Sequence, residues 1–461
     1  MAIVAALTTA TKNTKQQAIE RVFNATDITT SKMVDALREW NRLYYGREVA
    51  KESDPSQRIP VAIVSKLSRT VFSEFTADSN NPFFKKVIDG LETSRKRAVQ
   101  QALIGGEILL KPVMANDDIH FTIIDRQSYL IFGRDRKGNI TDIGTSETTA
   151  TGGFFYTLFE RRTVDEGGYL TIQNKLYRSK GREDIGNQVP LGSLPQYAAL
   201  EESATYTKPI GSIGLVRVRT PMENCVDGSN DGVSVYEPAA GLIRLININE
   251  AQISGEFEHG ESRIIVSNDM MEVDEKGKRA FRDHIFSGIP ESPEDVGVKI
   301  FSPAFREQSF LARKAEYLRN VESLIGLKRG ILSEVEATER TATEITSSAG
   351  DYNLTIIDFQ QMWETAIMEA ARLCGILGQL YNVRGAQEPT ENDIIISFGN
   401  GILYDEDKVW EQYKDMVARG LLKPEIAVAW YFDLPWDTDA DIAEIRRKYM
   451  PELEDLTHVK S

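Results

Sequence analysis

The chain has 461 residues, of which 41% are hydrophobic and 27% charged, as is typical of a folded protein with two or three domains. Its 69 acidic and 54 basic side chains give a formal net charge of −15, which argues against a surface built to grip nucleic-acid phosphates. No apolar run approaches the ~20 residues of a membrane span, and the apolar stretch at residues 2–7 is too short for a signal-peptide core, so we expect a protein made in the cytoplasm.

The first hundred residues predict helices. Apolar residues repeat every three or four positions in three stretches, which is typical of amphipathic helices. The stretches are residues 33–44 after a capping threonine at position 29 or 30, residues 64–75 after Pro60, and residues 82–103 before Gly105-Gly106.

Between residues 107 and 219 the apolar period becomes two, which favours strands. Strands are expected at residues 107–113, 120–125, 129–132, 140–143, 154–162, 169–177 and 215–219. Turn sequences such as Lys137-Gly138-Asn139 separate neighbouring strands. We therefore predict an α+β domain with a mainly antiparallel sheet over residues 1 to about 225.

A helical arm is predicted after the glycine-rich segment 227–232, whose composition indicates a hinge. One helix is expected over residues 236–260, two strands at 263–267 and 298–301 around a polar middle, and a second helix of about 24 residues ending near Ile325. Because residues 305–388 contain no proline, a long helix can follow from Thr343 to about Tyr381 after a loop. The part from Glu388 onward has 17 acidic and 8 basic side chains and is expected to be helical.

No residue pattern indicates catalysis, a metal or a cofactor. The four histidines share no short spacing, and the chain lacks a phosphate-binding G-x-x-x-x-G-K-[ST] loop. Asp437, Asp439 and Asp441 resemble the start of a calcium loop, but Ile442 and Lys448 replace the residues that such a loop needs, so we expect an acidic surface turn. Cys225 and Cys374 lie far apart and are expected to be free, buried thiols.

Three cations, Lys328, Arg329 and Arg340, bracket the loop between the two last long helices. One interpretation is that they are solvated charges at helix ends; the other is that a polyanion passes there. The same loop contains Glu334, Glu336 and Glu339. Such mixed charge would give a weak, sliding contact, because few counterions would be released.

These features together resemble the portal proteins of tailed bacteriophages that infect Gram-positive hosts, over roughly residues 30–430. The matching segments are Val64-Ser65-Lys66-Leu67-Ser68, Gly105-Gly106-Glu107 with Lys111-Pro112, Asp125 to Phe132 before the Gly138 turn, Asp231-Gly232-Val233-Ser234-Val235-Tyr236, and Thr341-Ala342-Thr343-Glu344-Ile345. No single motif is diagnostic; the ordered set carries the resemblance.

The resemblance implies a ring, usually of twelve subunits, at one capsid vertex of the virion. Its parts would be a wing at residues 1–233 with an N-terminal arm at 1–15, a first stem helix at 234–261, a clip at 262–303, a second stem helix at 304–326, a tunnel loop at 327–341, a long wing helix at 342–385 and a crown at 386–461. The tunnel loop, with Lys328, Arg329, Gly330 and Arg340, would face double-stranded DNA. The clip, with Asp274, Glu275, Lys276 and Lys278, would dock the terminase large subunit and later a head-completion adaptor.

The implied partners are further copies of the chain, major capsid and scaffolding proteins, and no membrane. An acidic ring would repel phosphate and keep DNA from sticking, and the work of packaging would come from a partner ATPase. Two other classes stay open. A magnesium-dependent nuclease would need clustered carboxylates, and a helical scaffold or adaptor would need sustained heptads, from which Leu354, Ile357, Phe359, Trp363 and Ile367 drift.

Overall fold

The computed structural model describes residues 14–46, 55–115, 118–259, 263–265, 271–273, 279–281, 299–301, 306–334, 342–390, 393–398, 406–432, 434–436 and 438–450. The chain forms two compact units, residues 1–398 and residues 399–461. The predicted crown begins earlier, at residue 386; the named domains of the sequence prediction stay predictions.

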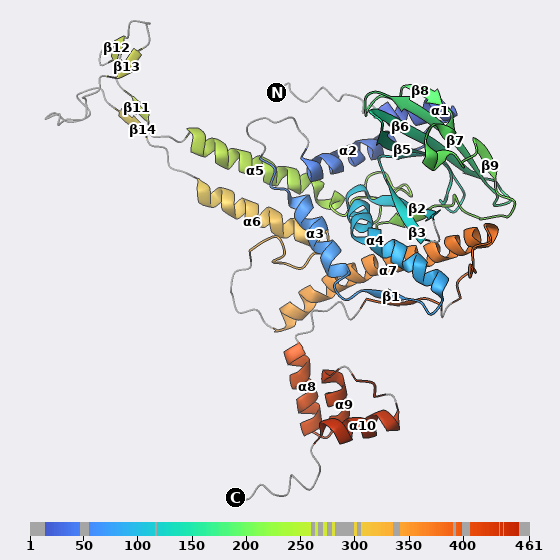
Figure 1. Cartoon of the computed structure of the whole chain (residues 1–461). Coiled ribbons are helices and arrows are strands. Elements are labelled where there is room, and N and C mark those ends of the chain that lie inside the picture. The colour runs from blue at the N-terminus through green and yellow to red at the C-terminus, as the bar shows by residue number, and fades with distance from the viewer. Residues whose placement is uncertain are drawn as a thin grey trace, which may run out of the picture. The chain divides into compact units, whose positions relative to one another are not determined.

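Four helices open the first unit (Figure 1). They are α1 (Thr14–Phe23), α2 (Ser31–Tyr45), α3 (Ile59–Val71) and α4 (Pro82–Gly105). The Thr30 hydroxyl accepts a hydrogen bond from the Met33 amide at 3.2 Å, and the Asn81 side chain accepts one from the Phe83 amide at 2.9 Å. These contacts satisfy amides that a helix start leaves unpaired. The predicted threonine cap thus lies at Thr30, and the Asn81 cap, which was not predicted, fixes where α4 begins.

Two antiparallel sheets follow. The first has the order β10-β2-β3, formed by β2 (Glu107–Ala115), β3 (Asp118–Asp125) and β10 (Val216–Arg219). The second has the order β4-β5-β6-β7-β8, with β9 also paired to β7. Its strands are β4 (Tyr129–Arg134), β5 (Ile140–Thr151), β6 (Phe154–Val164), β7 (Leu170–Ser179), β8 (Asn187–Val189) and β9 (Ser203–Thr205). The expected α+β class is confirmed.

The main core lies between the helices and the three-stranded sheet. Trp40 of α2, Phe84 of α4, Tyr236 and Trp363 are among its largest fully buried side chains. Trp363 belongs to α7 (Ala342–Leu380), which packs against α3, α4 and β10. A long helix predicted from a proline-free sequence therefore buries one face in its own unit.

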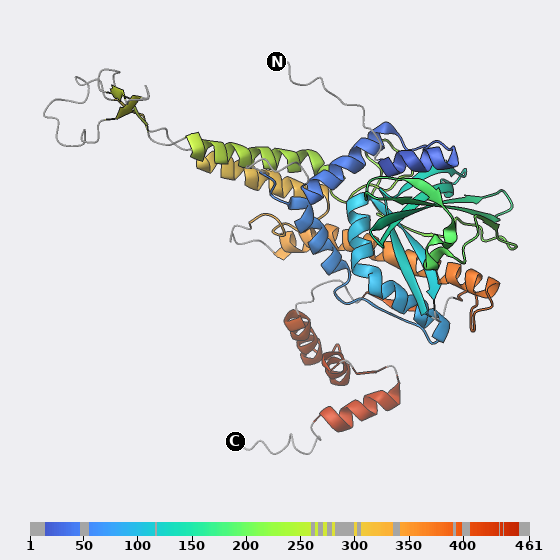
Figure 2. The same cartoon turned by 45° about the horizontal axis from the view of Figure 1, so that its top comes forward.

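Two helices lead away from the sheets, α5 (Ala240–His259) and α6 (Glu307–Leu324), with the short 3-10 helix η3 (Glu237–Ala239) before α5 (Figure 2). The helix α6 has 18 residues, fewer than the expected 24. Between the two helices, β11 (Arg263–Ile265) and β14 (Lys299–Phe301) lie within the two predicted strands and pair with each other. The polar middle also contains a hairpin of β12 (Met271–Val273) and β13 (Arg279–Phe281), which the sequence prediction missed.

The first unit closes with a pairing between distant parts of the chain. The strand β1 (Thr76–Asp78) pairs with β15 (Ile395–Ser397). Residues 395–397 thus belong to the same unit as the N-terminal helices, although the sequence prediction placed them in the crown.

The second unit consists of α8 (Glu406–Ala418), α9 (Pro424–Tyr431) and α10 (Asp439–Tyr449). Thr438 and Asp441 form a reciprocal capping box at the start of α10. Asp439 and Asp441 of the acidic cluster that resembled a calcium loop therefore lie in the first turn of a helix, where carboxylates are favourable; Asp437 lies outside the described residues.

Candidate functional site

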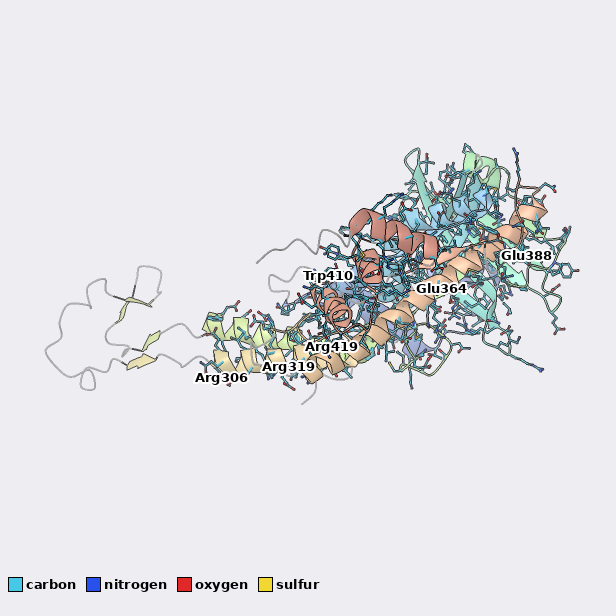
Figure 3. The ribbon with its side chains drawn as sticks, turned by 90° about the horizontal axis from the view of Figure 1, so that it is seen from below. Arg306, Arg319, Glu364, Glu388, Trp410 and Arg419 are labelled. Carbon is cyan, nitrogen blue, oxygen red and sulfur yellow. The ribbon has the colours of Figure 1, made fainter. Side chains whose placement is uncertain are left out.

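The arm formed by α5 and α6 is an antiparallel pair held by polar contacts. The Asn249 side chain donates to the Phe310 carbonyl at 3.1 Å and accepts from the Arg313 Nε at 2.7 Å. Lys314 Nζ lies 2.8 Å from a Glu250 carboxylate oxygen, and Arg306 pairs with Glu256 further out. Figure 3 shows Arg306 further along the arm than Arg319. These contacts fix the register of the two helices.

The outer surface of the arm carries exposed apolar side chains. Leu245 and Ile248, three residues apart on α5, are 42% and 51% exposed, and Leu311 of α6 is 48% exposed. The opposite face of α5 is buried through Ile243 and Ile246. The helix thus has two apolar faces, and its own chain covers one of them.

A buried carboxylate organises the loop after α6. Glu322 is 0% exposed, and its oxygens accept hydrogen bonds from the amides of Leu332 at 2.5 Å and Ser333 at 2.9 Å, and from the Ser333 hydroxyl at 2.7 Å. A fourth donor, the Gly330 amide, lies at 3.4 Å. The charge of Glu322 is therefore compensated by backbone and hydroxyl dipoles.

Gly326 makes the turn that leads into this loop. Its φ is +67°, in the left-handed region, and the Leu327 amide bonds to the Glu322 carbonyl at 2.8 Å, as in a Schellman helix end. A Cβ at Gly326 would lie 2.3 Å from the Thr355 hydroxyl of α7. Both conformation and space require glycine here.

The predicted DNA-facing residues fall partly on this loop. Lys328, Arg329 and Gly330 are exposed, and within the described part of the chain neither basic side chain forms an ion pair. Arg340 and the predicted docking residues Asp274, Glu275, Lys276 and Lys278 lie outside the described residues. Of the predicted set, the structure thus brings together three neighbours at the inner end of α6.

A second buried carboxylate ties the base of the arm to the sheet. Glu107, at the start of β2, is 0% exposed and accepts from the Tyr129 hydroxyl at 2.7 Å, the Arg217 Nε at 2.8 Å and the Gly232 amide at 3.2 Å. Burial raises the pKa of Glu107, but the charges of Arg217 and Arg126 outweigh it and bring the pKa to about 2.

The glycine-rich segment before α5, predicted as a hinge, is held by side-chain hydrogen bonds in this structure; that it moves as a hinge stays a prediction. The Asn224 amide group donates to Asp227 at 2.9 Å and to the Ser229 hydroxyl at 3.1 Å. Asp231 accepts from Arg134 at 2.6 Å. Glycine allows backbone angles that other residues rarely adopt. Here the hydrogen bonds of the Asn224, Asp227, Ser229 and Asp231 side chains hold the segment in a turn.

A third buried carboxylate joins the two sheets. Glu160 of β6 is 3% exposed and lies 2.8 Å from Lys111 of β2 and 2.7 Å from Arg162. Burial raises its pKa, and the nearby Arg162 and Lys111 lower it to about 2.

Both cysteines are free, as expected. Cys374 is buried, as expected, but Cys225 is exposed, because it lies in a surface turn after Asn224.

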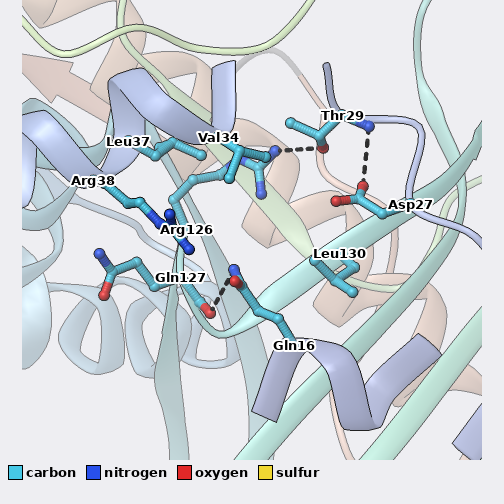
Figure 4. Close-up of a pocket in the computed structure, with 9 residues that line it drawn as sticks. All are labelled: Gln16, Asp27, Thr29, Val34, Leu37, Arg38, Arg126, Gln127 and Leu130. Atoms are coloured by element: carbon cyan, nitrogen blue, oxygen red, sulfur yellow. Dashed lines mark hydrogen bonds between the residues drawn. The ribbon is translucent and has the colours of Figure 1, made fainter. Parts of the chain in front are cut away.

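A groove beside α2 is also lined by polar residues (Figure 4). The pocket in the figure has a volume of about 150 Å³; a separate pocket, which shares Arg38 and Arg126 with it and is also lined by Arg42, has a volume of about 560 Å³. Arg42 lies 4.0 Å from Glu39, Arg126 lies 3.4 Å from Glu107, and Asp27 and Asp125 line the groove beside Arg38. Carboxylates of the chain thus lie beside Arg42 and Arg126 and reduce the positive charge that these arginines could offer to an anion.

The sequence analysis missed Glu322 and Glu107 as organising residues. The signal for Glu322 was its place on the apolar stripe of α6, where a charged residue needs a partner.

Among the described residues, no three histidine, cysteine or carboxylate side chains are placed to hold a metal ion. No helix in the described part of the chain is long and apolar enough to cross a membrane.

Comparisons with known proteins give little further guidance. No family model and no curated protein matches the sequence. Among solved structures, one chain described as "Neck of native GTA particle computed with C12 symmetry" is similar over 92% of this chain and 99% of its own length, with 12% identity and a TM-score of 0.44. A TM-score below 0.5 does not establish a common fold.

Proposed function

We propose that the protein is a portal subunit of a tailed bacteriophage: several copies form a ring at one capsid vertex, and double-stranded DNA passes through the centre during packaging and ejection. The observation that carries the proposal is the arm, a helix pair that exposes the apolar side chains Leu245 and Ile248 on α5 and Leu311 on α6. Further copies of the arm would cover these side chains.

Lys328 and Arg329 would face the channel in such a ring. Their loop is fixed by Glu322, and no described acidic side chain pairs with them. Two cations beside the exposed Glu334 make a weak contact with phosphates, which suits a duplex that must slide. The ring would bind major capsid and scaffolding proteins, and residues 262–303 would dock the terminase large subunit and then a head-completion adaptor.

The protein would have no enzymatic activity and need no cofactor. A helical scaffold with α7 as a coiled-coil seam is disfavoured, since Trp363 and Ile367 are buried against the rest of their own unit. A nuclease is disfavoured because the buried carboxylates described above are each paired with arginine, lysine or amide donors.

Sedimentation velocity of the purified protein tests self-assembly. We expect a species many times heavier than the 51.7 kDa chain, over a wide range of salt concentration. A monomer at all protein concentrations and salts would overturn the proposal.

A further inference from the structure

The two pockets of the groove beside α2 adjoin each other, because Arg38, Arg126 and Gln127 line both of them. Along α2 the lining residues run from Val34 to Tyr45 at spacings of three and four, so one whole side of the helix forms a wall. At 1.5 Å per residue this wall is roughly 16 Å long. That length matches about five residues of an extended chain.

Amide side chains on the walls of the groove have hydrogen-bonding atoms to spare. The Asn41 amide nitrogen donates to the Leu37 carbonyl at 2.8 Å, and its side-chain oxygen stays open as an acceptor. The Gln101 amide nitrogen donates to the Tyr45 hydroxyl at 3.1 Å and likewise leaves its oxygen open. The Gln127 side chain forms no hydrogen bond within the described part of the chain. An extended peptide needs such partners for its backbone N–H and C=O groups.

Arg38 supplies the positive charge of the groove. It is exposed and, within the described part of the chain, forms neither an ion pair nor a hydrogen bond. The charge of Arg126, by contrast, is balanced by the buried Glu107. Figure 4 shows the Arg38 side chain reaching toward Arg126 and Gln127. A ligand carboxylate placed there would meet a guanidinium that the described part of the chain leaves without a counter-charge.

The two aspartates that line the groove are engaged by their own loops. Asp27 accepts a hydrogen bond from the Thr29 amide at 3.0 Å. Asp125 accepts from the Gln127 amide at 3.0 Å and from the Ser128 hydroxyl at 2.9 Å. Neither aspartate forms an ion pair with the arginine at position 38, so that guanidinium stays open to a ligand.

We propose that the groove beside α2 binds an extended peptide segment of a partner protein. One aspartate or glutamate carboxylate of the peptide would pair with Arg38, and its backbone would bond to Asn41, Gln101 and Gln127. The planar guanidinium suits a carboxylate because it can donate two parallel hydrogen bonds. The length of the groove and the amide side chains along it favour a peptide over a free anion. This inference goes beyond the proposed ring and does not depend on it.

Two pools of short synthetic peptides, with blocked ends, test the proposal on the full-length protein. One pool has glutamate at its central position and the other has glutamine, and every other position is varied. We expect the protein to enrich peptides from the glutamate pool, as read by mass spectrometry. Recovery of peptides equally from both pools, or from neither, would overturn the inference.

Titration calorimetry with an enriched peptide then locates its site. We expect Arg38→Gln to weaken binding roughly tenfold or more, because a charge-assisted hydrogen bond is lost. Arg38→Lys keeps the charge but not the planar fork and should bind with intermediate affinity. The matched control is Arg69→Gln, an exposed arginine of α3 that lines neither pocket, and it should bind like the wild type.

Two further outcomes would contradict the assignment. Equal affinity of Arg38→Gln and Arg69→Gln would place the peptide elsewhere on the molecule. Inorganic phosphate that binds in the groove as tightly as the enriched peptide would show a site for a free anion instead. The urea midpoints of the variants, measured beside the wild type, show that each is folded.

Discussion

At the scale of single residues, buried carboxylates fix the segments that meet at the base of the arm. Glu322 holds the loop after α6 through amides and a hydroxyl, and Glu107 holds the start of β2 to Arg217 and to the Gly232 amide. A buried charge without such partners would cost several kcal/mol. These contacts place Lys328 and Arg329 on a fixed loop.

Replacing Glu322 tests whether it organises that loop. We expect Glu322→Ala to lower the free energy of unfolding by about 3 kcal/mol, because buried amide donors lose their acceptor. The loop should also open, so trypsin should cut faster after Lys328 and Arg329. The matched control is Glu316→Ala, whose carboxylate is exposed and pairs with Arg319. Equal proteolysis of the two variants would show that Glu322 does not hold the loop.

Acid should weaken the contact between the sheets. The pKa of Glu160 falls from 4.5 to about 2 on folding, so its ionised form stabilises the fold above pH 4.5, and this contribution is lost as the pH falls toward 2. We expect Glu160→Gln to be less stable than the wild type at pH 7, with a gap that narrows below pH 4.5 by up to ~1.4 kcal/mol per pH unit. Urea unfolding between pH 7 and pH 3 measures the gap. A constant gap would contradict an ion pair at Glu160.

Local sequence predicted these elements but not their partners. The helical spacing of apolar residues, the threonine cap before α2, the strand alternation after Gly106 and the proline-free stretch were enough to predict most helices and strands. The ion pair between Glu107 and Arg217 joins residues 110 positions apart, and β1 pairs with β15 from the other end of the first unit. Such contacts leave no trace in local periodicity, which is why neither the role of Glu107 nor the pairing of residues 395–397 with β1 was predicted.

At the scale of elements, the arm stands out because it exposes large apolar side chains to solvent. One face of α5 is buried through Ile243 and Ile246, and the outer face exposes Leu245 and Ile248. Periodicity predicted both helices, yet it could not show which apolar positions the chain's own fold covers. That distinction depends on how α5 and α6 pack, and the hydrogen bonds of Asn249 set that packing.

Charge placed on the outer face should block assembly. We expect the double variant Leu245→Lys, Ile248→Lys to remain folded but to sediment as a monomer, because burying two ammonium groups in a subunit contact is unfavourable. Ser254→Lys is the matched control: it lies about two and a half turns along α5 from Leu245, on another side of the helix. A double variant that assembles like the wild type would remove the arm from the contact.

At the scale of the whole molecule, the arm and the loop after α6 belong to the first compact unit. In the proposed ring the first unit would therefore supply both the contact between neighbours and the loop that faces the channel. The formal charge of −15 suits a passage that does not retain DNA, since the repulsion acts on every phosphate. None of these roles needs a catalytic centre.

Electron microscopy of the purified full-length protein tests the central claim most directly. Averaged top views should show closed rings of identical subunits, with a central opening wide enough for a DNA duplex. Discrete particles without an opening, or open filaments, would contradict the account.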